Sequence, residues 1–326
     1  MPFVRSDVQA FLDRLKAFGG PTLRQLGPEA GRQVYKAMGP MVELPRGTLA
    51  RVAELVIPSP QGHSFAGRLY AAHEAPEPGP VLVFFHGGGW VIGDLDTHDG
   101  LCAEIARQLH ITVLSIDYRL APEHSFPAAV EDALAAARWA AASPGEIGHA
   151  VTGLVVAGDS AGGNLAAVCA QELTGQLLVP VLAQWLIYPG VDFLSETNSL
   201  TEFGQGYVLT QDDIAFFHSH YLPNPADRGH IRASPLRASS LAGQPPTLVF
   251  TCGLDPLRDQ GRAYAAMLIE HGVSVRFREA AGQVHGCFNL RQAIPSAQRD
   301  LLGCLADLRA MIREAQSASH QTGADQ

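Results

Sequence analysis

The sequence predicts an α/β fold: a mostly parallel sheet of eight strands with helices on both faces, supplemented by a helical cap. Two observations lead to this fold class. From about residue 52, short runs rich in β-branched and aromatic residues alternate with longer stretches of helical periodicity, as in βαβ units. Several of the short runs, such as Val81–Phe85, are apolar throughout, which is typical of parallel strands covered on both faces.

The elements expected along the chain follow from this alternation. The strands are Val52–Ile57, Phe65–Ala71, Val81–Phe85, Thr112–Asp117, Gly153–Ala157, Ala183–Tyr188, Thr247–Thr251 and Ser274–Arg278. The helices between and after them are Thr97–Leu109, Ala128–Ala142, Ala161–Leu173, Arg258–Glu270 and Pro295–Ala315. The core of the fold is therefore expected to span residues 51–191 and 241–315.

Two segments interrupt the alternation, residues 1–50 and 192–240. We expect both to form cap segments over a ligand site at the carboxyl ends of the strands. The first segment carries apolar residues that share one helical face, namely Val8, Phe11, Leu12, Leu15 and Phe18. The tail, residues 316–326, is polar and without periodicity, so we expect it to be disordered.

The composition restricts the class of protein. The chain has 326 residues, of which 47% are hydrophobic and 17% charged, and this excludes a disordered protein or a small disulfide scaffold. The net charge of -9 disfavours nucleic acid and anionic membranes as partners. The five cysteines are odd in number and widely spaced, which argues against a disulfide framework or a zinc site. Without a secretory signal or an apolar run near ~18 residues, we expect a cytoplasmic protein with no membrane insertion.

The first candidate catalytic motif is Gly158–Gly162, which reads Gly-Asp-Ser-Ala-Gly. It lies between an expected strand and an expected helix, the context that a nucleophilic serine on a strained turn requires. The two glycines would relieve steric clashes at that turn, and the helix N-terminus would favour negative charge developing near Ser160. The alternative is a glycine-rich turn in which Ser160 is only the N-cap of the helix.

The second motif is His86–Trp90, which reads His-Gly-Gly-Gly-Trp and follows an apolar strand. Consecutive glycines let backbone N–H groups approach a reacting carbonyl closely, as an oxyanion hole requires. We expect the N–H groups of Gly87, Gly88 and Ala161 to be the donors. The alternative is a glycine-rich turn without a ligand, and His86 is expected to fix the loop.

A base and an orienting carboxylate should follow Ser160 in the order acid, then histidine. Asp255 comes directly after a strand that ends in glycine, and His285 follows the last strand by a short loop. Asp259 and Asp192 are weaker candidates for the acid. The other histidines after Ser160 are expected on the surface, and none forms a metal-binding motif: His218, His220, His230 and His271.

Together these motifs resemble those of the bacterial hormone-sensitive-lipase-like (family IV) carboxylesterases, which have the α/β-hydrolase fold. The resemblance covers about residues 78–290 and rests on the segments His86–Trp90, Asp117–Glu123, Gly158–Gly163, Asp255–Asp259 and His285–Gly286. It implies a cap built from the N-terminus and the segment after the sixth strand, no cofactor, and a dimer through the last strand. In the family an aromatic residue often follows directly after the His-Gly pair, whereas here Cys287 occupies that position. We expect this difference to alter the pocket wall without touching the triad.

The expected substrate-binding residues are Trp90, Asp159, Tyr188 and Phe217. A helix around Asp212–Tyr221 places three apolar side chains on one face, which suits either packing within the cap or the wall of an acyl pocket: Ile214, Phe217 and Tyr221. Within the Asp117–Glu123 motif, Arg119 and Glu123 are expected to form a buried ion pair.

The residues favour a serine carboxylesterase that cleaves short- to medium-chain acyl esters, a small-molecule substrate, through an acyl-enzyme. The same triad would serve on an amide, carbamate, lactone or thioester, because the triad sets the chemistry and the pocket sets the substrate. A ligand-binding protein without activity is disfavoured because all three triad residues are present. A long-chain lipase is disfavoured because no lipid-binding surface is evident.

Overall fold

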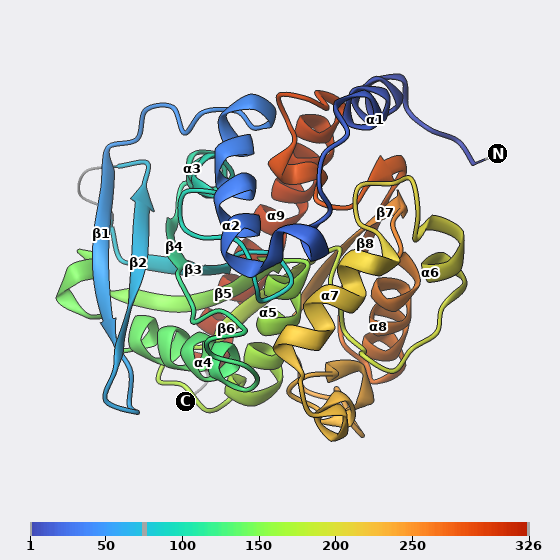
Figure 1. The fold of residues 1–326 in the computed structure, drawn as a ribbon. Coiled ribbons are helices and arrows are strands. Elements are labelled where there is room, and N and C mark those ends of the chain that lie inside the picture. The colour runs from blue at the N-terminus through green and yellow to red at the C-terminus, as the bar shows by residue number, and fades with distance from the viewer. Residues whose placement is uncertain (1, 74–76, 325–326) are drawn as a thin grey trace.

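The computed structural model describes residues 2–73 and 77–324, with side chains to residue 318. Its centre is an eight-stranded sheet in the order β1-β2-β4-β3-β5-β6-β7-β8 (Figure 1). β1 and β2 pair antiparallel, as do β2 and β4, and all other neighbours pair parallel. The predicted mostly parallel sheet is thus confirmed. The strands are β1 Arg51–Pro58, β2 Ser64–Ala71, β3 Gly79–Phe85, β4 Thr112–Ile116, β5 Val151–Asp159, β6 Val181–Ile187, β7 Thr247–Leu254 and β8 Val275–Val284.

Helices cover both faces of the sheet, as predicted. Side chains of β3 alternate between two hydrophobic clusters, because successive residues of a strand point to opposite faces. One cluster includes α4 (Ala128–Ala141), α5 (Ala161–Leu173) and α8 (Arg258–Glu270). The other includes α3 (Asp99–Leu109) and α9 (Ser296–Ala324). Short 3₁₀ turns lie at Gly145–Ile147, Pro225–Gly229, Pro235–Arg237 and Cys287–Asn289.

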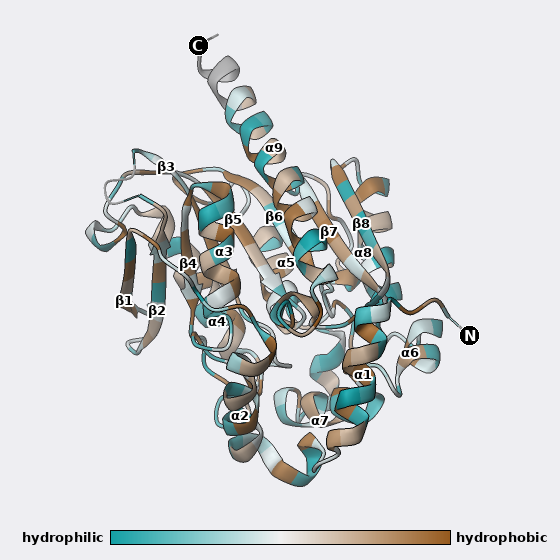
Figure 2. Cartoon of the chain, turned by 90° about the horizontal axis from the view of Figure 1, so that it is seen from above, coloured by the Kyte–Doolittle hydropathy of each residue, from teal (hydrophilic) through white to brown (hydrophobic). Residues whose placement is uncertain are grey.

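The remaining helices come from the two segments that interrupt the alternation: α1 (Ser6–Phe18), α2 (Leu23–Val42), α6 (Asn198–Phe203) and α7 (Gln211–Tyr221). α1, α2 and α7 gather at one end of the molecule, away from the end of α9 (Figure 2). Arg32 of α2 donates hydrogen bonds to the carbonyls of Val91 and Ala121, in the loops after β3 and β4. An ion pair of 2.8 Å between Arg24 and Asp212 joins α2 to α7. The two segments therefore meet above the carboxyl ends of the strands.

One prediction about the ends of the chain is wrong. Helix α9 continues to Ala324, so residues 316–324 are not a disordered tail, whereas 325–326 lie outside the described residues. The polar character of this segment does not oppose a helix, because Gln and Ala are good helix formers and no proline interrupts it. Phe18 shares a helical face with Val8 and Phe11, but it is 85% exposed because α1 ends there.

The predicted ion pair between Arg119 and Glu123 is also wrong. Arg119 instead pairs with Asp132 of α4, which is fully buried, at 2.9 Å. Glu123 pairs with Arg32 of α2 at 2.6 Å. Two side chains four residues apart in a loop have no fixed geometry relative to each other, so each pairs with a residue of a different helix.

Candidate active site

Ser160 lies on the sharp turn between β5 and α5. Its backbone has φ 55° and ψ -115°, a conformation that is strained for a residue with a side chain. Glycine is required on both sides, because a Cβ on Gly162 would collide with the Phe85 carbonyl and one on Gly158 with that of Gly162. The Ser160 side chain makes no capping hydrogen bond, which excludes the alternative of a simple N-cap.

The structure brings Ser160, His285 and Asp255 together in one hydrogen-bonded chain. His285 Nε2 lies 2.9 Å from Ser160 Oγ, and His285 Nδ1 lies 2.8 Å from Asp255 Oδ2. The Asp255 side chain is fully buried and also accepts a hydrogen bond from the Leu257 N–H. The three residues follow β5, β7 and β8, whose carboxyl ends lie at the same edge of the sheet. A serine in this setting can act as a nucleophile whose proton passes to the histidine.

The two weaker candidates for the acid have other partners. Asp259 accepts hydrogen bonds from Arg258 and the Ser199 N–H. Asp192 binds Arg237 at 2.8 Å, and although burial raises its pKa, hydrogen bonds from Arg237 and Ser195 hold it below the ordinary value. Neither carboxylate contacts His285.

The prediction that Gly87 supplies an oxyanion donor is wrong. Its N–H donates to Asp159 Oδ1 at 2.8 Å, which directs it away from the nucleophile. Among the described residues, the N–H groups of Gly88, Gly89 and Ala161 donate no hydrogen bond to the protein. Gly89 and Ala161 line the same cavity as Ser160. Gly89, which the sequence analysis missed, is therefore better placed than Gly87 to donate to a group bound beside Ser160.

Asp159 was expected to contact substrate, and this expectation is also wrong. The residue is 3% exposed and does not line the cavity. Its carboxylate lies 3.1 Å from His98 Nε2 in addition to the Gly87 N–H. Asp159 therefore holds the glycine segment in place through the N–H of Gly87.

His86 fixes this segment, as predicted. Its ring is fully buried, stacks on Tyr118 at 4.3 Å and donates from Nδ1 to the Gly87 carbonyl. The Tyr118 hydroxyl donates in turn to the His86 carbonyl at 2.7 Å. Burial lowers the pKa of His86 to about 4, so the ring is neutral near pH 7.

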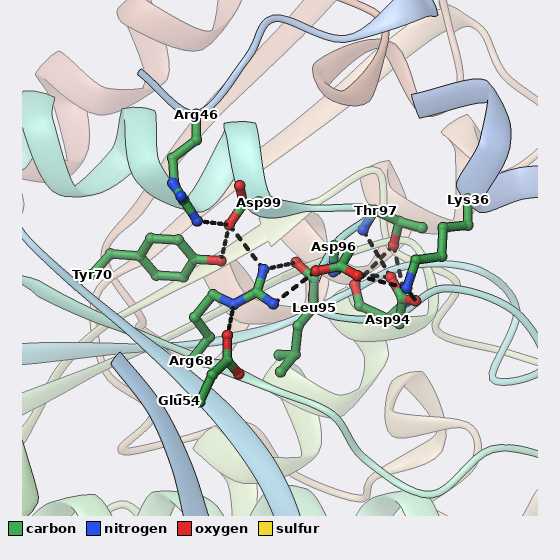
Figure 3. A network of polar contacts seen from close by, with 10 residues as sticks. All are labelled: Lys36, Arg46, Glu54, Arg68, Tyr70, Asp94, Leu95, Asp96, Thr97 and Asp99. Carbon is green, nitrogen blue, oxygen red and sulfur yellow. Dashed lines mark hydrogen bonds and ion pairs between the residues drawn. The ribbon is translucent and has the colours of Figure 1, made fainter. Parts of the chain in front are cut away.

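An ionic network anchors the loop that follows the glycines (Figure 3). Lys36 of α2 reaches Asp94 at 2.9 Å and Asp96 at 2.5 Å. Arg68 of β2 binds Asp96 and Asp99 at 2.7 and 2.9 Å. These contacts tie α2 and the sheet to the same loop, which limits the freedom of the preceding glycine segment.

A cavity of about 40 Å³ lies beside Ser160 and opens to solvent. The walls are mostly apolar: Trp90, Phe193, Leu209, Ile214, Phe217 and Leu257. Polar side chains are Ser160, Asp192, His218 and Gln260, and backbone surface comes from Gly89, Ala161 and Gly190. Trp90 and Phe217 thus lie where substrate contact was expected.

Three expectations about the pocket need correction. Tyr188 is buried behind His285, with ring centroids 4.8 Å apart, and does not line the cavity. His218 is not a surface residue: it lines the cavity and packs on Phe193. Cys287 is fully buried with its sulfur 3.7 Å from that of Cys252, away from the pocket wall.

The face of α7 serves both roles that the sequence left open. Ile214 and Phe217 line the cavity. Tyr221 instead packs flat beneath Trp90, with ring centroids 4.3 Å apart. The helix therefore forms one wall of the pocket and also anchors the indole next to it.

The described residues contain neither a metal-binding cluster nor a membrane-spanning helix. No three His, Cys, Asp or Glu side chains gather there in an arrangement suited to a metal ion. None of the helices there combines the length and hydrophobicity that crossing a bilayer requires.

The fold and the Ser160 turn define a hydrolase of the α/β class, and comparisons with known proteins give the family. A family model described as alpha/beta hydrolase fold matches residues 82–289. The carboxylic ester hydrolase LipN of Mycobacterium tuberculosis is 46% identical, over 80% of this chain and 69% of the relative. An ethyl acetate hydrolase of Pseudomonas putida is 36% identical, over 77% of this chain and 80% of the relative. The chain belongs to the hormone-sensitive-lipase-like α/β-hydrolases.

A solved structure supports the same assignment. The crystal structure of a thermostable esterase from Pseudomonas putida superposes with a TM-score of 0.91 and 34% identity. The match covers 96% of this chain and 98% of that one. It therefore extends over both cap segments as well as the core.

Proposed function

We propose that this carboxylic ester hydrolase cleaves short- to medium-chain acyl esters through Ser160, His285 and Asp255. The observation that carries the proposal is the continuous pair of hydrogen bonds from Ser160 through His285 to Asp255, of 2.9 and 2.8 Å. The names of the relatives, which include an ethyl acetate hydrolase, support an ester as the substrate.

In this mechanism His285 Nε2 takes the proton of Ser160 as the Oγ attacks the ester carbonyl. Asp255 holds the ring through Nδ1 and stabilises the imidazolium that forms. The oxyanion accepts hydrogen bonds from the N–H groups of Gly88, Gly89 and Ala161. His285 then protonates the departing alcohol, and water activated by the same residue releases the acid from Ser160.

The position of the cavity supports its assignment as the binding site of the acyl group. The departing oxygen must lie near His285 Nε2, which protonates it, and His285 is not among the residues that line the cavity. Ser160, Gly89 and Ala161 do line it, so the cavity opens on the other side of the reacting carbonyl. Its small volume of about 40 Å³ favours short and medium acyl chains.

The test is a series of p-nitrophenyl esters from acetate to palmitate, measured with the wild type and with Ser160→Ala. We expect kcat/KM to be highest for chains of two to about eight carbons and to vanish in the variant. Cleavage of amides, lactones or thioesters with no cleavage of esters would reject the ester assignment. Activity that survives Ser160→Ala would reject the nucleophile.

We further propose that two copies pair through β8, one of the two edge strands of the sheet. The strand leaves Phe277 41% exposed, and unpaired edges favour strand pairing between chains. Light scattering coupled to size-exclusion chromatography should give twice the chain mass, whereas a monomer at all concentrations would reject this assembly.

A further inference from the structure

Gln260 presents a hydrogen-bond donor of fixed direction to the acyl cavity. The residue is 7% exposed and lies in the first turn of α8. Its Oε1 accepts hydrogen bonds from the backbone N–H groups of Val191 and Asp192, at 2.9 and 3.1 Å. Because a backbone N–H can only donate, the amide oxygen must face these groups and the amide nitrogen must face elsewhere.

The amide nitrogen donates no hydrogen bond to any residue in the part of the chain that the structure describes, where the side chain acts only as an acceptor. Gln260 lines the cavity together with Ser160, so its unpaired N–H group is available to an acyl group bound in that cavity. A buried donor left without a partner is costly once substrate displaces water. The mechanism described above gives this group no role.

His218 adds a second polar group to the same cavity, from the cap side. Its ring packs on Phe193 with centroids 4.4 Å apart, and neither ring nitrogen has a hydrogen bond to another described residue. Burial lowers the pKa of His218 to about 4, so near pH 7 the ring offers one donor and one acceptor. Apart from Ser160 and Asp192, whose carboxylate is paired with Arg237, the other side chains that line the cavity are apolar, among them Leu209 and Leu257.

We propose that the acyl pocket selects oxygenated acyl groups, such as hydroxy- or oxo-acyl esters, through a hydrogen bond from Gln260 Nε2. His218 is the second partner for a substrate hydroxyl. The inference rests on the proposed ester hydrolysis and adds the substrate class. A pocket that hydrogen-bonds a substrate oxygen discriminates strongly against an analogue that lacks it, because the buried donor then stays unpaired.

The experiment compares kcat/KM for ethyl butyrate with that for ethyl 2-hydroxybutyrate, ethyl 3-hydroxybutyrate and ethyl acetoacetate. Each value is divided by the rate constant for alkaline hydrolysis of the same ester, which removes differences in intrinsic reactivity. We expect at least one oxygenated ester to exceed butyrate by 10-fold or more in the wild type. Equal or lower values for all three would overturn the inference while leaving ester hydrolysis intact, whereas no cleavage of any ester would reject the proposed function.

Gln260→Glu provides the sharpest variant. Its carboxylate can still accept the hydrogen bonds from Val191 and Asp192, but the second oxygen can no longer donate. We expect the preference for the oxygenated ester to fall about 10-fold, with the KM for that ester rising more than the KM for butyrate. Gln176→Glu, an exposed position on the surface, makes the same change of charge and serves as the control.

His218→Phe keeps a ring against Phe193 and removes both ring nitrogens, so it tests the second partner even where Gln260→Glu folds poorly. We expect the preference for hydroxy esters to fall at least 3-fold. An unchanged preference in both folded variants, judged by their thermal transitions, would overturn the inference.

Discussion

The side chain of Asp159 accepts a hydrogen bond from the N–H of Gly87 at 2.8 Å, so the residue before the nucleophile holds the first glycine of the oxyanion segment. The two motifs lie far apart in the sequence, on β5 and after β3, which are parallel neighbours in the sheet. One carboxylate thus couples the position of Ser160 to the loop that carries Gly88 and Gly89.

Asp159→Ala should reduce kcat by about 10- to 100-fold with little change in KM, because the loop would lose its anchor while the pocket walls stay in place. Asp159→Asn keeps an acceptor oxygen and should retain most of the activity. Steady-state kinetics on one p-nitrophenyl ester distinguish the two variants. Equal activity in wild type and Asp159→Ala would show that the hydrogen bond does not position the loop.

Gly89→Ala should lower kcat/KM by about 100-fold, since its new methyl group would overlap the ring of Phe217 and displace the N–H donor. The double variant Gly89→Ala with Phe217→Ala removes that overlap and should recover at least 5-fold of the loss. The comparison requires Phe217→Ala alone as the reference. No recovery would mean that the methyl group acts on something other than Phe217.

Asp255→Asn should lower kcat by about 10³–10⁴-fold, because an amide cannot stabilise the imidazolium of His285 and can favour the wrong tautomer. Asp259→Asn, four residues away on the same loop and helix, has no contact with His285 and should change kcat less than 3-fold. Kinetics of the two purified variants assign the acid. A larger loss in Asp259→Asn would reverse the assignment.

Stability should fall on acidification between about pH 6.5 and pH 4. Burial lowers the pKa of His86 and of His218 to about 4, whereas an unfolded histidine titrates near 6.5. In that window the two histidines bind protons in the unfolded chain but not in the folded one. Asp117, whose pKa burial raises to about 6, binds one proton in the opposite sense. The two histidines outweigh it, so the free energy of unfolding decreases as the pH falls. Hydrogen bonds from basic partners lower the pKa of some carboxylates, such as Asp96, which pairs with Lys36. Protonation of these carboxylates lowers the free energy of unfolding further, but only below about pH 4.

Thermal unfolding measured at intervals from pH 7 to pH 4 checks this window. His218→Phe removes one of the two titrating groups, so its melting temperature should decline less steeply than that of the wild type. Identical slopes for the two proteins would show that His218 titrates normally in the folded state.

The strands, the core helices and the serine turn follow from the sequence because each has a local signature. Val81–Phe85 is apolar enough to identify a buried strand, and Gly158–Gly162 occurs between a strand and a helix. Asp255 and His285 can be chosen because each comes soon after a strand, where parallel strands bring their carboxyl ends together.

The sequence could not identify the oxyanion donors or the pocket walls, for a physical reason. Three consecutive glycines have no side chains to indicate which N–H points to the site. Only the tertiary contact with Asp159 shows that the Gly87 N–H points elsewhere. Helical periodicity puts His218 on α7 but does not tell which face of a cap helix turns toward the core. The partners of Arg119 and Gln260 likewise depend on tertiary contacts with distant elements.

The central claim is that Ser160 is the covalent nucleophile, activated by His285. It is tested most directly by treating the protein with phenylmethylsulfonyl fluoride and mapping the modified peptide by mass spectrometry. One sulfonyl group on Ser160, formed in step with the loss of esterase activity and formed far more slowly in His285→Ala, is the predicted result. Loss of activity with the label on another residue, or full activity with Ser160 modified, would contradict it.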